Sequence, residues 1–311
     1  MSKIDFMRTY LKVVEKGSLK AAAKDLNISV STVSFQINSL EKLYGAKLLN
    51  RNVSGVSLTD EGIIAKKNME SILGDIEETK KLIDNLREDK VTILSGMVGL
   101  NMIFHLQSLL KAKYPSLEVN VDFKGAHECI KMLSWGKADF VIAGDITESV
   151  KSDKFNITEV GKDWLVLVTP PDHPLNHKKE VFIEDLIEHP LISLTEDYGI
   201  ATSVRKALEK SGYHDLEPSL TVGDFFLQLN SISSNYGIGI TSMIASSKAY
   251  EIGMVNMRPI KDLEDMRSAY LVTSNLASQC EKMGEYLEFM TDNLKKMFKE
   301  YLKVYQSLDS K

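Results

Sequence analysis

Two kinds of hydrophobic periodicity divide the chain. Up to about residue 88, apolar residues recur three and four positions apart, which is typical of amphipathic helices. No proline precedes Pro115, so the residue type that breaks helices most strongly is missing from this part of the chain. The pattern predicts helices over residues 3–16, 18–25, 30–44 and about 60–88.

After Lys90, short runs rich in β-branched and aromatic residues alternate with helical stretches. The predicted strands cover 91–95, 117–123, 139–144, 163–170, 190–195, 219–224, 237–242 and 269–274. The predicted helices cover about 99–113, 127–135, 201–211, 225–234 and 276–304. This alternation is typical of a parallel, doubly wound α/β sheet. Because it occurs in two sets, we expect a two-lobed α/β body with a cleft, and a chain that returns to the first lobe at its end.

The helix predicted over 60–88 carries a narrow apolar seam. Thr59 is placed to cap its start. The seam positions follow a 4-3 spacing and are Ala65, Met69, Ile72, Ile76, Thr79, Ile83 and Leu86. Such a helix either packs on its own domain or pairs with the same helix of a second copy. The narrow heptad spacing favours self-association.

Composition and charge narrow the class of protein. Hydrophobic residues make up 43% and charged residues 26% of the 311 residues, as in globular proteins. No apolar run is long enough to span a bilayer, and the first residues, MSKIDFMRTY, lack the apolar core of a signal peptide. We therefore expect a cytoplasmic protein without a membrane partner. The net charge is −5, yet residues 1–60 hold nine Lys or Arg against five Asp or Glu, which indicates a small basic module on an acidic body.

The stretch GSLKAAAKDLNISVSTVSFQINSLEKLYG, residues 17–45, has the features of a helix-turn-helix. Its small residues at 21–23 allow a second helix to cross closely, and Ser29 is a good N-cap for that helix. The buried stripe expected on the second helix is Val33, Ile37, Leu40 and Leu43. The opposite face offers Val30, Ser31, Ser34, Phe35 and Asn38. Short polar side chains bind base edges or phosphates, and apolar ones contact thymine methyl groups. The alternative is a helical hairpin with no role in DNA binding.

These residues also carry a resemblance. The chain is similar to LysR-type transcriptional regulators through Gly17-Ser18, Ala21-Ala22-Ala23, Ser29, Ser34-Phe35-Gln36-Ile37, Leu40-Glu41 and Leu58-Thr59-Asp60-Glu61-Gly62. The similarity continues through YPSLEVNV (114–121), GKADFVIAG (136–144), HPL (173–175) and NYGIGITS (235–242), and so covers nearly the whole chain.

The resemblance implies three parts. These are a winged helix-turn-helix DNA-binding domain over 1–59, a linker and dimerisation helix over 60–89, and an effector-binding domain over 90–311 that resembles type II periplasmic binding proteins. Within the last, lobe I would span about 90–162 and 269–311, and lobe II about 163–268. The family implies homodimers or homotetramers on interrupted inverted repeats of double-stranded DNA. The expected DNA-binding residues are Ser18, Ser29, Val30, Ser31, Ser34, Phe35, Asn38 and Arg51.

The chain departs from the family pattern in its DNA-reading residues. Val30 and Phe35 stand where members commonly carry Gln and Arg or Lys, and Ser54 stands where the wing usually has a second basic residue. Fewer phosphate contacts weaken DNA binding and flatten its salt dependence. We expect an AT-rich operator, with Val30 and Phe35 against thymine methyl groups.

In an open sheet of this kind, ligands bind beyond the carboxyl ends of strands, where helix N-termini offer free donors. The matching turns are SGMVG (95–99), DITES (145–149), LTEDYG (194–199) and VGDF (222–225). In LysR-type regulators, residues at these places contact a small effector, so the resemblance implies as effector-binding residues Ser95, Gly96, Met97, Thr147, Thr195 and Gly223. Helix N-termini favour an anion or carboxylate. Acidic residues in these turns would favour an amine or zwitterion instead, and they are Asp145, Glu148, Glu196 and Asp224.

An enzyme and a solute-binding protein are the two other classes of protein to consider. No nucleophile elbow, phosphate loop or zinc-protease motif occurs, so we expect no enzyme, no catalytic residues, no metal and no cofactor beyond the effector. Cys129 and Cys280 match no metal or redox spacing and are expected to be buried thiols. A solute-binding protein is the alternative, because the same two-lobed fold serves that function. It would leave residues 1–90 without a role and would require a secretion signal.

Overall fold

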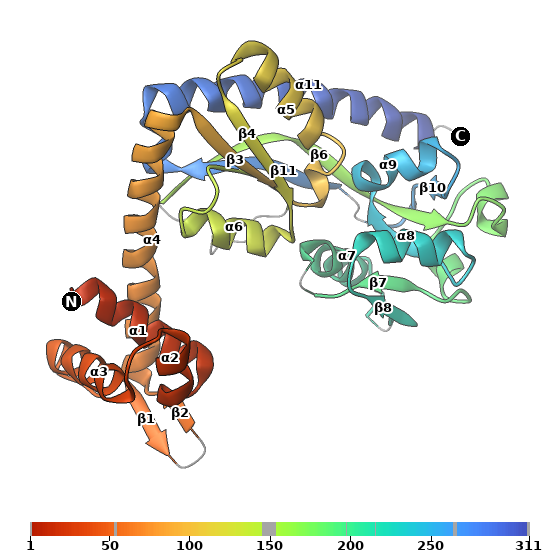
Figure 1. The fold of residues 1–311 in the computed structure, drawn as a ribbon. Helices are drawn as coiled ribbons and strands as arrows, with labels where there is room; N and C mark the ends of the chain where they lie inside the picture. Colours follow the sequence, from red (N-terminus) through yellow and green to blue (C-terminus); the bar gives the residue numbers. More distant parts are fainter. Residues whose placement is uncertain are drawn as a thin grey trace. The chain divides into compact units, whose positions relative to one another are not determined.

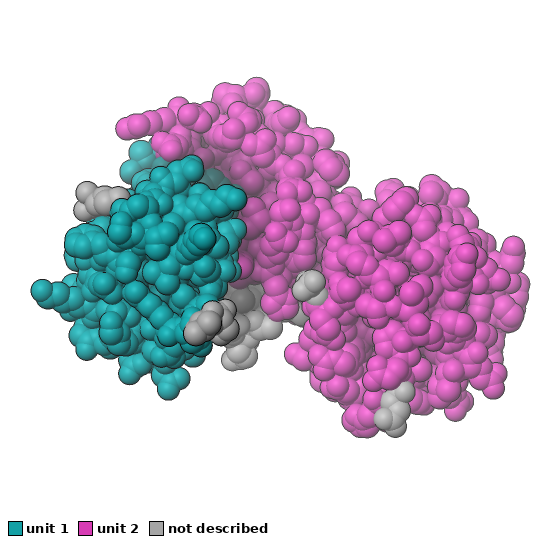
Figure 2. Space-filling model, turned by 60° about the horizontal axis from the view of Figure 1, so that its bottom comes forward, with its two compact units in different colours: residues 1–83, 134–137 teal, residues 84–133, 138–311 magenta. Residues whose placement is uncertain are grey.

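The structure is a computed structural model that describes residues 2–52, 55–144, 154–196, 198–214, 216–263 and 266–309. It divides into two compact units, drawn in teal and magenta in Figure 2. Unit 1 consists of Met1–Ile83 and Ser134–Lys137, and unit 2 consists of Asp84–Leu133 and Ala138–Lys311. The long helix α4 (Asp60–Glu88) begins in unit 1 and ends in unit 2.

Unit 1 is a bundle of helices with a two-stranded wing. Its elements are α1 (Lys3–Lys16), α2 (Leu19–Asp25), α3 (Val30–Tyr44), β1 (Leu49–Asn52), β2 (Gly55–Leu58) and most of α4 (Asp60–Glu88). The chain turns where the sequence offers stops: Gly17 and Gly45 follow α1 and α3 in the left-handed conformation that glycine tolerates. The core of the bundle includes Tyr10, Val33 and Ile37, each fully buried.

The apolar stripe of α3 differs from its prediction at one position. Val33, Ile37 and Leu40 are buried as expected, but Leu43 is 55% exposed. Glu41 takes the buried position near the end of the helix because its carboxylate binds the start of the wing.

Unit 2 contains two lobes. The elements of lobe I are β3 (Lys90–Ser95), η1 (Met97–Gly99), α5 (Ile103–Lys113), β4 (Glu118–Phe123), α6 (Ala126–Ser134), β5 (Phe140–Gly144), β11 (Met266–Ser274), α10 (Asn275–Ser278) and α11 (Glu281–Asp309). The elements of lobe II are η3 (Pro174–His177), η4 (Ile183–Leu186), β7 (Ile192–Leu194), α7 (Gly199–Lys210), β8 (Leu220–Val222), α8 (Phe225–Ser233), β9 (Gly239–Ser242), α9 (Met243–Glu251) and β10 (Asn256–Arg258). The long strand β6 (Phe155–Thr169) runs through both lobes (Figure 1).

The main sheet is mixed, whereas the sequence pattern predicts a parallel one. Its strand order is β10-β6-β11-β5-β3-β4, and β9 also pairs with β6. Within this sheet β4, β3 and β5 run parallel, and so does the separate pair of β7 and β8. The prediction of parallel sheets is wrong for the rest because β6 and β11 cross between the lobes in opposite directions and pair with each other. The local pattern of a strand contains no information about its direction.

Helices cover both faces of the lobe I sheet (Figure 1). On one face, α6 packs through the buried residues Cys129 and Leu133 against Leu94 and Val141 of the strands. On the other face, α11 packs on β6, where Trp164 and Tyr305 stack with ring centroids 4.7 Å apart. The core of lobe I therefore lies in two layers, one on each side of the sheet.

Most helix predictions match, with three differences. The helix expected over 99–113 begins at Ile103, since residues Met97–Gly99 form a tight 3₁₀ turn in which Gly99 N donates to Gly96 O. The helix expected over 276–304 is two helices, α10 and α11, and the second continues to Asp309. Neither α9 nor β10 was predicted.

The seam of α4 is used in two ways. Ala65 and Met69 are buried in the core of unit 1, so the prediction that they face a partner helix is wrong. Ile72 and Ile76 are half-buried, and Thr79 and Ile83 are exposed. The side chain of Leu86 lies outside the described part. Among the described seam residues, Thr79 and Ile83 in its second half are therefore the most open to a second copy. Thr59 caps α4 as predicted, because its hydroxyl accepts from Gly62 N at 2.9 Å.

Candidate DNA-binding face and effector site

The start of α3 is fixed by hydroxyl groups. The Ser29 side chain accepts a hydrogen bond from Thr32 N at 3.0 Å, which caps the helix. The same hydroxyl lies 2.7 Å from the hydroxyl of Ser31 and 2.7 Å from that of Thr32. Ser29 and Ser31 are both exposed, so this cap also presents two hydroxyls at the first turn of the helix.

The wing and α3 meet at one surface. Arg51 of β1 donates to the Ser34 hydroxyl and to Asn38 Oδ1, each at 3.2 Å. Val30 is 46% exposed and Phe35 is 62% exposed on the same helix. The structure thus brings together most of the expected DNA-binding residues. Ser18 is used differently, because its hydroxyl accepts from Ala21 N and caps α2.

Phe35 is supported from below by α1. Its ring makes an edge contact with Phe6, with centroids 6.1 Å apart. Lys3 places its Nζ 5.2 Å from the centre of the Phe6 ring. Sequence reasoning missed both residues, and only the apolar periodicity of the first helix pointed to Phe6. The contact holds an exposed aromatic ring in a defined orientation, at low cost in side-chain entropy.

The end of α3 anchors the wing through Glu41. Its carboxylate accepts from Lys47 Nζ at 2.7 Å and from Leu48 N at 3.0 Å. Burial alone would raise the pKa of Glu41, but these two hydrogen bonds outweigh it and hold that pKa below its ordinary value. The Leu-Glu motif therefore has a structural role: it fixes where the wing begins.

The second strand of the wing ends in another anchor. The Thr59 hydroxyl donates to Lys47 O at 2.7 Å, and Gly62 O accepts from the Tyr10 hydroxyl at 2.9 Å. A Cβ on Gly62 would lie 2.0 Å from Leu48 O, so only glycine fits there. The Leu-Thr-x-x-Gly motif joins the wing, α4 and α1 at this point.

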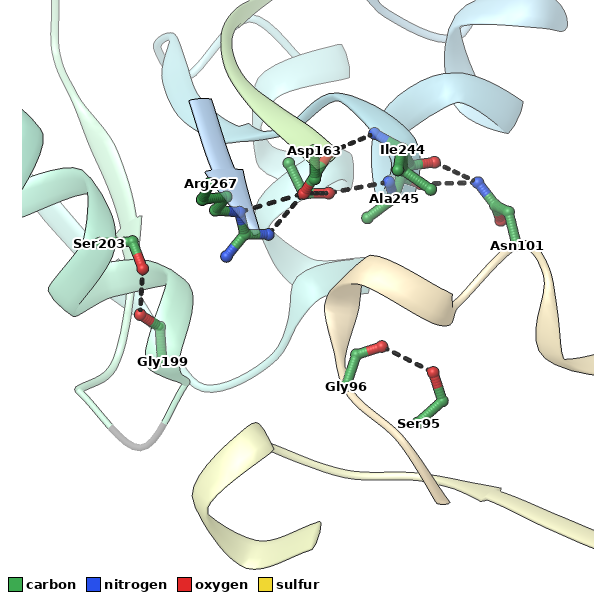
Figure 3. Close-up of polar contacts among 10 residues, drawn as sticks. Ser95, Gly96, Asn101, Asp163, Gly199, Ser203, Ile244, Ala245 and Arg267 are labelled. Carbon is green, nitrogen blue, oxygen red and sulfur yellow. Dashed lines mark hydrogen bonds and ion pairs between the residues drawn. The ribbon is translucent and has the colours of Figure 1, made fainter. Parts of the chain in front are cut away.

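The expected effector residues of lobe I are buried. Ser95 is fully buried and its hydroxyl donates to Gly96 O at 2.9 Å (Figure 3). Gly96 N donates to Ile142 O at 2.8 Å, and Met97 is buried as well. The Ser95 hydroxyl and Gly96 N are therefore already bonded within lobe I and are not free donors.

In lobe II, the expected effector residues lie at the ends of the parallel pair. Thr195 N donates to Val222 O at 3.1 Å, and Gly223 is exposed with no atom near its free side. Thr147, Asp145 and Glu148 lie outside the described residues.

The remaining two acidic residues are engaged with their own helices. The Asp224 carboxylate accepts from Leu227 N at 2.8 Å and caps α8. Glu196 accepts from the Thr202 hydroxyl at 3.0 Å and pairs with Arg205 of α7. Their charges are therefore partly compensated before any effector binds.

The two lobes touch where α6 and α7 begin. A Cβ on Gly199, the first residue of α7, would lie 3.7 Å from Ala126 Cβ and 3.9 Å from His127 Nδ1. A second contact between the lobes is polar. Asn101 donates to Ile244 O at 2.6 Å and to Ala245 O at 3.2 Å (Figure 3).

A buried ion pair joins the two strands that cross between the lobes. Arg267 of β11 donates to Asp163 Oδ2 of β6 from Nη2 at 2.6 Å and from Nε at 3.1 Å (Figure 3). The same carboxylate accepts from the Ser242 hydroxyl at 2.7 Å and from Ile244 N at 3.1 Å. Sequence reasoning did not assign these residues. A charged residue at the start of the apolar run DWLVLVTP was the available signal.

Comparison with known proteins identifies the family. Residues 4–63 match the model of the bacterial regulatory helix-turn-helix protein, lysR family, and residues 91–295 match the LysR substrate binding domain. The chain belongs to the LysR family. It is also 32% identical over 295 residues to an uncharacterised HTH-type transcriptional regulator of Methanocaldococcus jannaschii. The alignment covers 93% of this chain and 98% of that relative.

Solved LysR structures share the fold. CbnR, a LysR family transcriptional regulator, superposes with a TM-score of 0.62 at 18% identity, covering 95% of this chain and 100% of CbnR. The regulatory domain of CcmR from Synechocystis PCC6803, in complex with 2-PG, gives a TM-score of 0.60 at 18% identity. That match covers 67% of this chain and 98% of the CcmR domain.

The LysR family assignment favours a regulator over a solute-binding protein. A match to the regulatory helix-turn-helix over residues 4–63 gives the N-terminal part a role, which the solute-binding alternative does not. The protein is a LysR-family regulator with a helix-turn-helix and a substrate-binding domain. Within the described residues, no helix is both long and apolar enough to cross a membrane.

Proposed function

We propose that this LysR-family chain is a cytoplasmic transcription factor and not an enzyme. It reads an interrupted inverted repeat of double-stranded DNA as a homodimer or homotetramer, and a small molecule bound between its lobes changes how its DNA-binding heads are held. The observation that carries the proposal is the pair of hydrogen bonds from Arg51 to Ser34 and Asn38, which unites wing and helix in one polar surface.

The DNA-reading surface consists of Ser18, Ser29, Val30, Ser31, Ser34, Phe35, Asn38 and Arg51. In a helix-turn-helix the first turns of the second helix enter the major groove. The exposed side chains of Val30 and Phe35 suit thymine methyl groups, so we propose an AT-rich operator. Footprinting that finds protection only on GC-rich half-sites would contradict this preference.

A gel shift with the DNA upstream of the protein's own gene tests the DNA-binding surface, at low and at moderate salt. Ser34→Arg puts a bulky cation beside Arg51 and is expected to change operator affinity without unfolding the domain. Gln279→Arg is the control, because it adds the same charge at an exposed position between α10 and α11. Equal affinities for wild type and Ser34→Arg would place the reading surface elsewhere.

Arg51 supplies a second readout. Arg51→Gln removes one cation from the surface, so the slope of log affinity against log salt is expected to fall by about 1. An unchanged slope would mean that Arg51 contacts no phosphate and serves only to join the wing to α3.

We further propose the domain boundaries 1–59, 60–89 and 90–311 and an effector site lined by Gly96, Thr195 and Gly223, above the floor of Ser95 and Met97. Thr147 is proposed from the family pattern alone. Because Glu196 and Asp224 are engaged with α7 and α8, the helix N-termini at the lobe contact favour an anionic effector over an amine.

A thermal-shift screen of the full chain tests this effector class. A ligand that binds the native state raises the melting temperature by mass action. Small carboxylates and phosphates are expected to raise it, and small amines of equal size are expected to leave it unchanged. A rise with amines alone would reverse the assignment.

A further inference from the structure

Helix α6 begins at the contact between the lobes. Its first residue, Ala126, lies against two glycines from different elements. A Cβ on Gly96, in the turn after β3, would be 3.6 Å from Ala126 Cβ, and a Cβ on Gly199 of α7 would be 3.7 Å from it. The start of α6 therefore fills the space between the turn after β3 and the first turn of α7.

The end of α6 lies on the helix that leads to the DNA-binding domain. A Cβ on Gly74 of α4 would lie 2.3 Å from Ser134 O, the last residue of α6. Gly136 has φ +63, and a Cβ there would lie 2.5 Å from Glu78 N. One glycine on each side thus lets the two backbones touch directly, with no side chain between them to absorb movement.

A second contact with α4 is made by Asp139, three residues after Gly136. Asp139 is buried, and its carboxylate accepts from Asn85 Nδ2 at 2.8 Å and from Thr92 N at 2.7 Å. Asn85 belongs to α4, seven positions after Glu78. The segment Gly136–Asp139 therefore binds α4 at two places, about two turns apart.

The turn of α4 against Gly136 is also bound to the helix-turn-helix. Arg8 of α1 forms an ion pair with Glu77, the residue before Glu78. Both side chains are roughly half exposed, so the ion pair adds little to stability. It shows that α1 contacts this turn of α4.

We propose that α6 is the mechanical link between the lobe contact and the linker helix. A change at the Ala126 end moves α6 as a rigid rod of nine residues, and the backbone contacts of Gly74 with Ser134 and of Gly136 with Glu78 pass that movement to the turn of α4 that carries Glu77. Close-packed backbones move together or separate, because they do not deform gradually. The role in regulation rests on the proposed function, whereas the coupling itself does not.

Hydrogen exchange followed by mass spectrometry on the full chain, without DNA or effector, tests the link. Gly199→Val adds bulk against Ala126, and Gly199→Ala is the matched control, because a single Cβ fits there at 3.7 Å. We expect Gly199→Val to change amide exchange over residues 72–82 of α4 at least threefold and Gly199→Ala to leave it unchanged.

The uncoupling variant is Gly136→Asn. Asparagine tolerates φ +63, so the variant chiefly adds the clash with Glu78. Its control is Gly212→Asn, at φ +89 with open space around it. Gly136→Asn is expected to abolish the response of α4 to Gly199→Val, and Gly212→Asn is expected to preserve it. If circular dichroism shows that Gly136→Asn does not fold, Gly74→Ala takes its place.

The link is overturned if Gly199→Val changes exchange over residues 126–133 and leaves residues 72–82 as in wild type. It is equally overturned if the response of α4 persists in the Gly136→Asn background. Should Gly199→Val leave α6 itself unchanged, Ala126→Phe applies the stronger displacement and is judged by the same two outcomes. A negative result here leaves the gel shift unaffected, so it is distinguishable from failure of the proposed function.

Discussion

Single residues at element junctions decide how the DNA-binding domain is assembled. The side-chain oxygens of Glu41 and Thr59 form hydrogen bonds that place the wing against α3 and α4. Gly62 lets the wing approach α4 closely because it has no side chain. Each lies at the boundary of an element, where backbone groups lack partners from regular structure. Their roles are structural, so substitutions there are expected to act on DNA binding through stability.

Replacing Gly62 by alanine tests the close contact between α4 and the wing by adding a single carbon atom. The added Cβ would lie 2.0 Å from Leu48 O, so the substitution is expected to lower the free energy of unfolding by about 1–3 kcal/mol through overpacking. Gly284→Ala is the control, because that helical glycine has only an ordinary contact at 3.6 Å and alanine is the better helix former. It is expected to raise stability by about 0.5–1 kcal/mol. Urea denaturation of both variants decides, and similar effects of the two would refute the clash.

A histidine pair in lobe II makes stability depend on pH. His173 and His189 lie with ring centroids 4.6 Å apart, and burial followed by the nearby His189 lowers the pKa of His173 below 6.5. The unfolded chain therefore takes up a proton at higher pH than the folded one. The contribution is fully present above about pH 6.5 and is lost as the pH falls below it.

His173→Asn checks this dependence. Asparagine can still accept from Leu175 N, as His173 Nδ1 does, but it does not titrate. Urea denaturation at several pH values between about 5 and 8 is expected to show a smaller loss of stability at low pH in the variant than in wild type. Parallel curves would mean that groups other than His173 account for the dependence.

At the scale of elements, the helices of unit 1 could be predicted closely and the sheet of unit 2 could not. The bounds of α1, α3 and α4 follow from caps and periodicity, which are local properties. The antiparallel pairing of β6 with β11 joins residues about a hundred positions apart, such as Asp163 and Arg267. The hydrophobic pattern of a short stretch of sequence carries no information about such long-range pairing.

The candidate sites show the same division. The residues of α3 could be named from the sequence because one helix presents them all. The contact of Arg51 with Ser34 and Asn38 could not, since it depends on how the wing folds back. The family resemblance implies Ser95, at the end of β3, as an effector-binding residue, and its hydroxyl is bound to Gly96 O. Position in the fold was predictable, and the direction of a side chain was not.

The ion pair between the crossing strands allows a prediction about β6 and β11. Arg267→Met leaves the Asp163 carboxylate buried without its cation and is expected to cost about 3–5 kcal/mol. The double variant Asp163→Asn with Arg267→Met removes the stranded charge while an amide oxygen still accepts from Ser242 or Ile244. It is expected to recover part of that loss in a chemical denaturation experiment. A double variant no more stable than Arg267→Met would show that the loss comes from packing and not from the buried charge.

At the scale of the whole molecule, function requires two DNA-binding heads, and the open half of the α4 seam is where copies are expected to pair. Thr79 is exposed, and its hydroxyl donates to Asp75 O at 2.8 Å within the helix. Its hydrogen bond is therefore satisfied inside α4 and does not contribute to pairing with a second copy. Thr79→Leu puts an apolar side chain next to Ile83 on the same stripe, and burying it against a second copy is expected to add about 1–2 kcal/mol per dimer. The dimer dissociation constant should then fall by roughly tenfold, measured by analytical ultracentrifugation over a range of concentrations. Lys80→Leu is the matched control, because it adds the same side chain one position off the seam and is expected to leave that constant unchanged. Equal effects of the two substitutions would indicate nonspecific hydrophobic association. Monomers in every case would show that α4 is not the pairing surface.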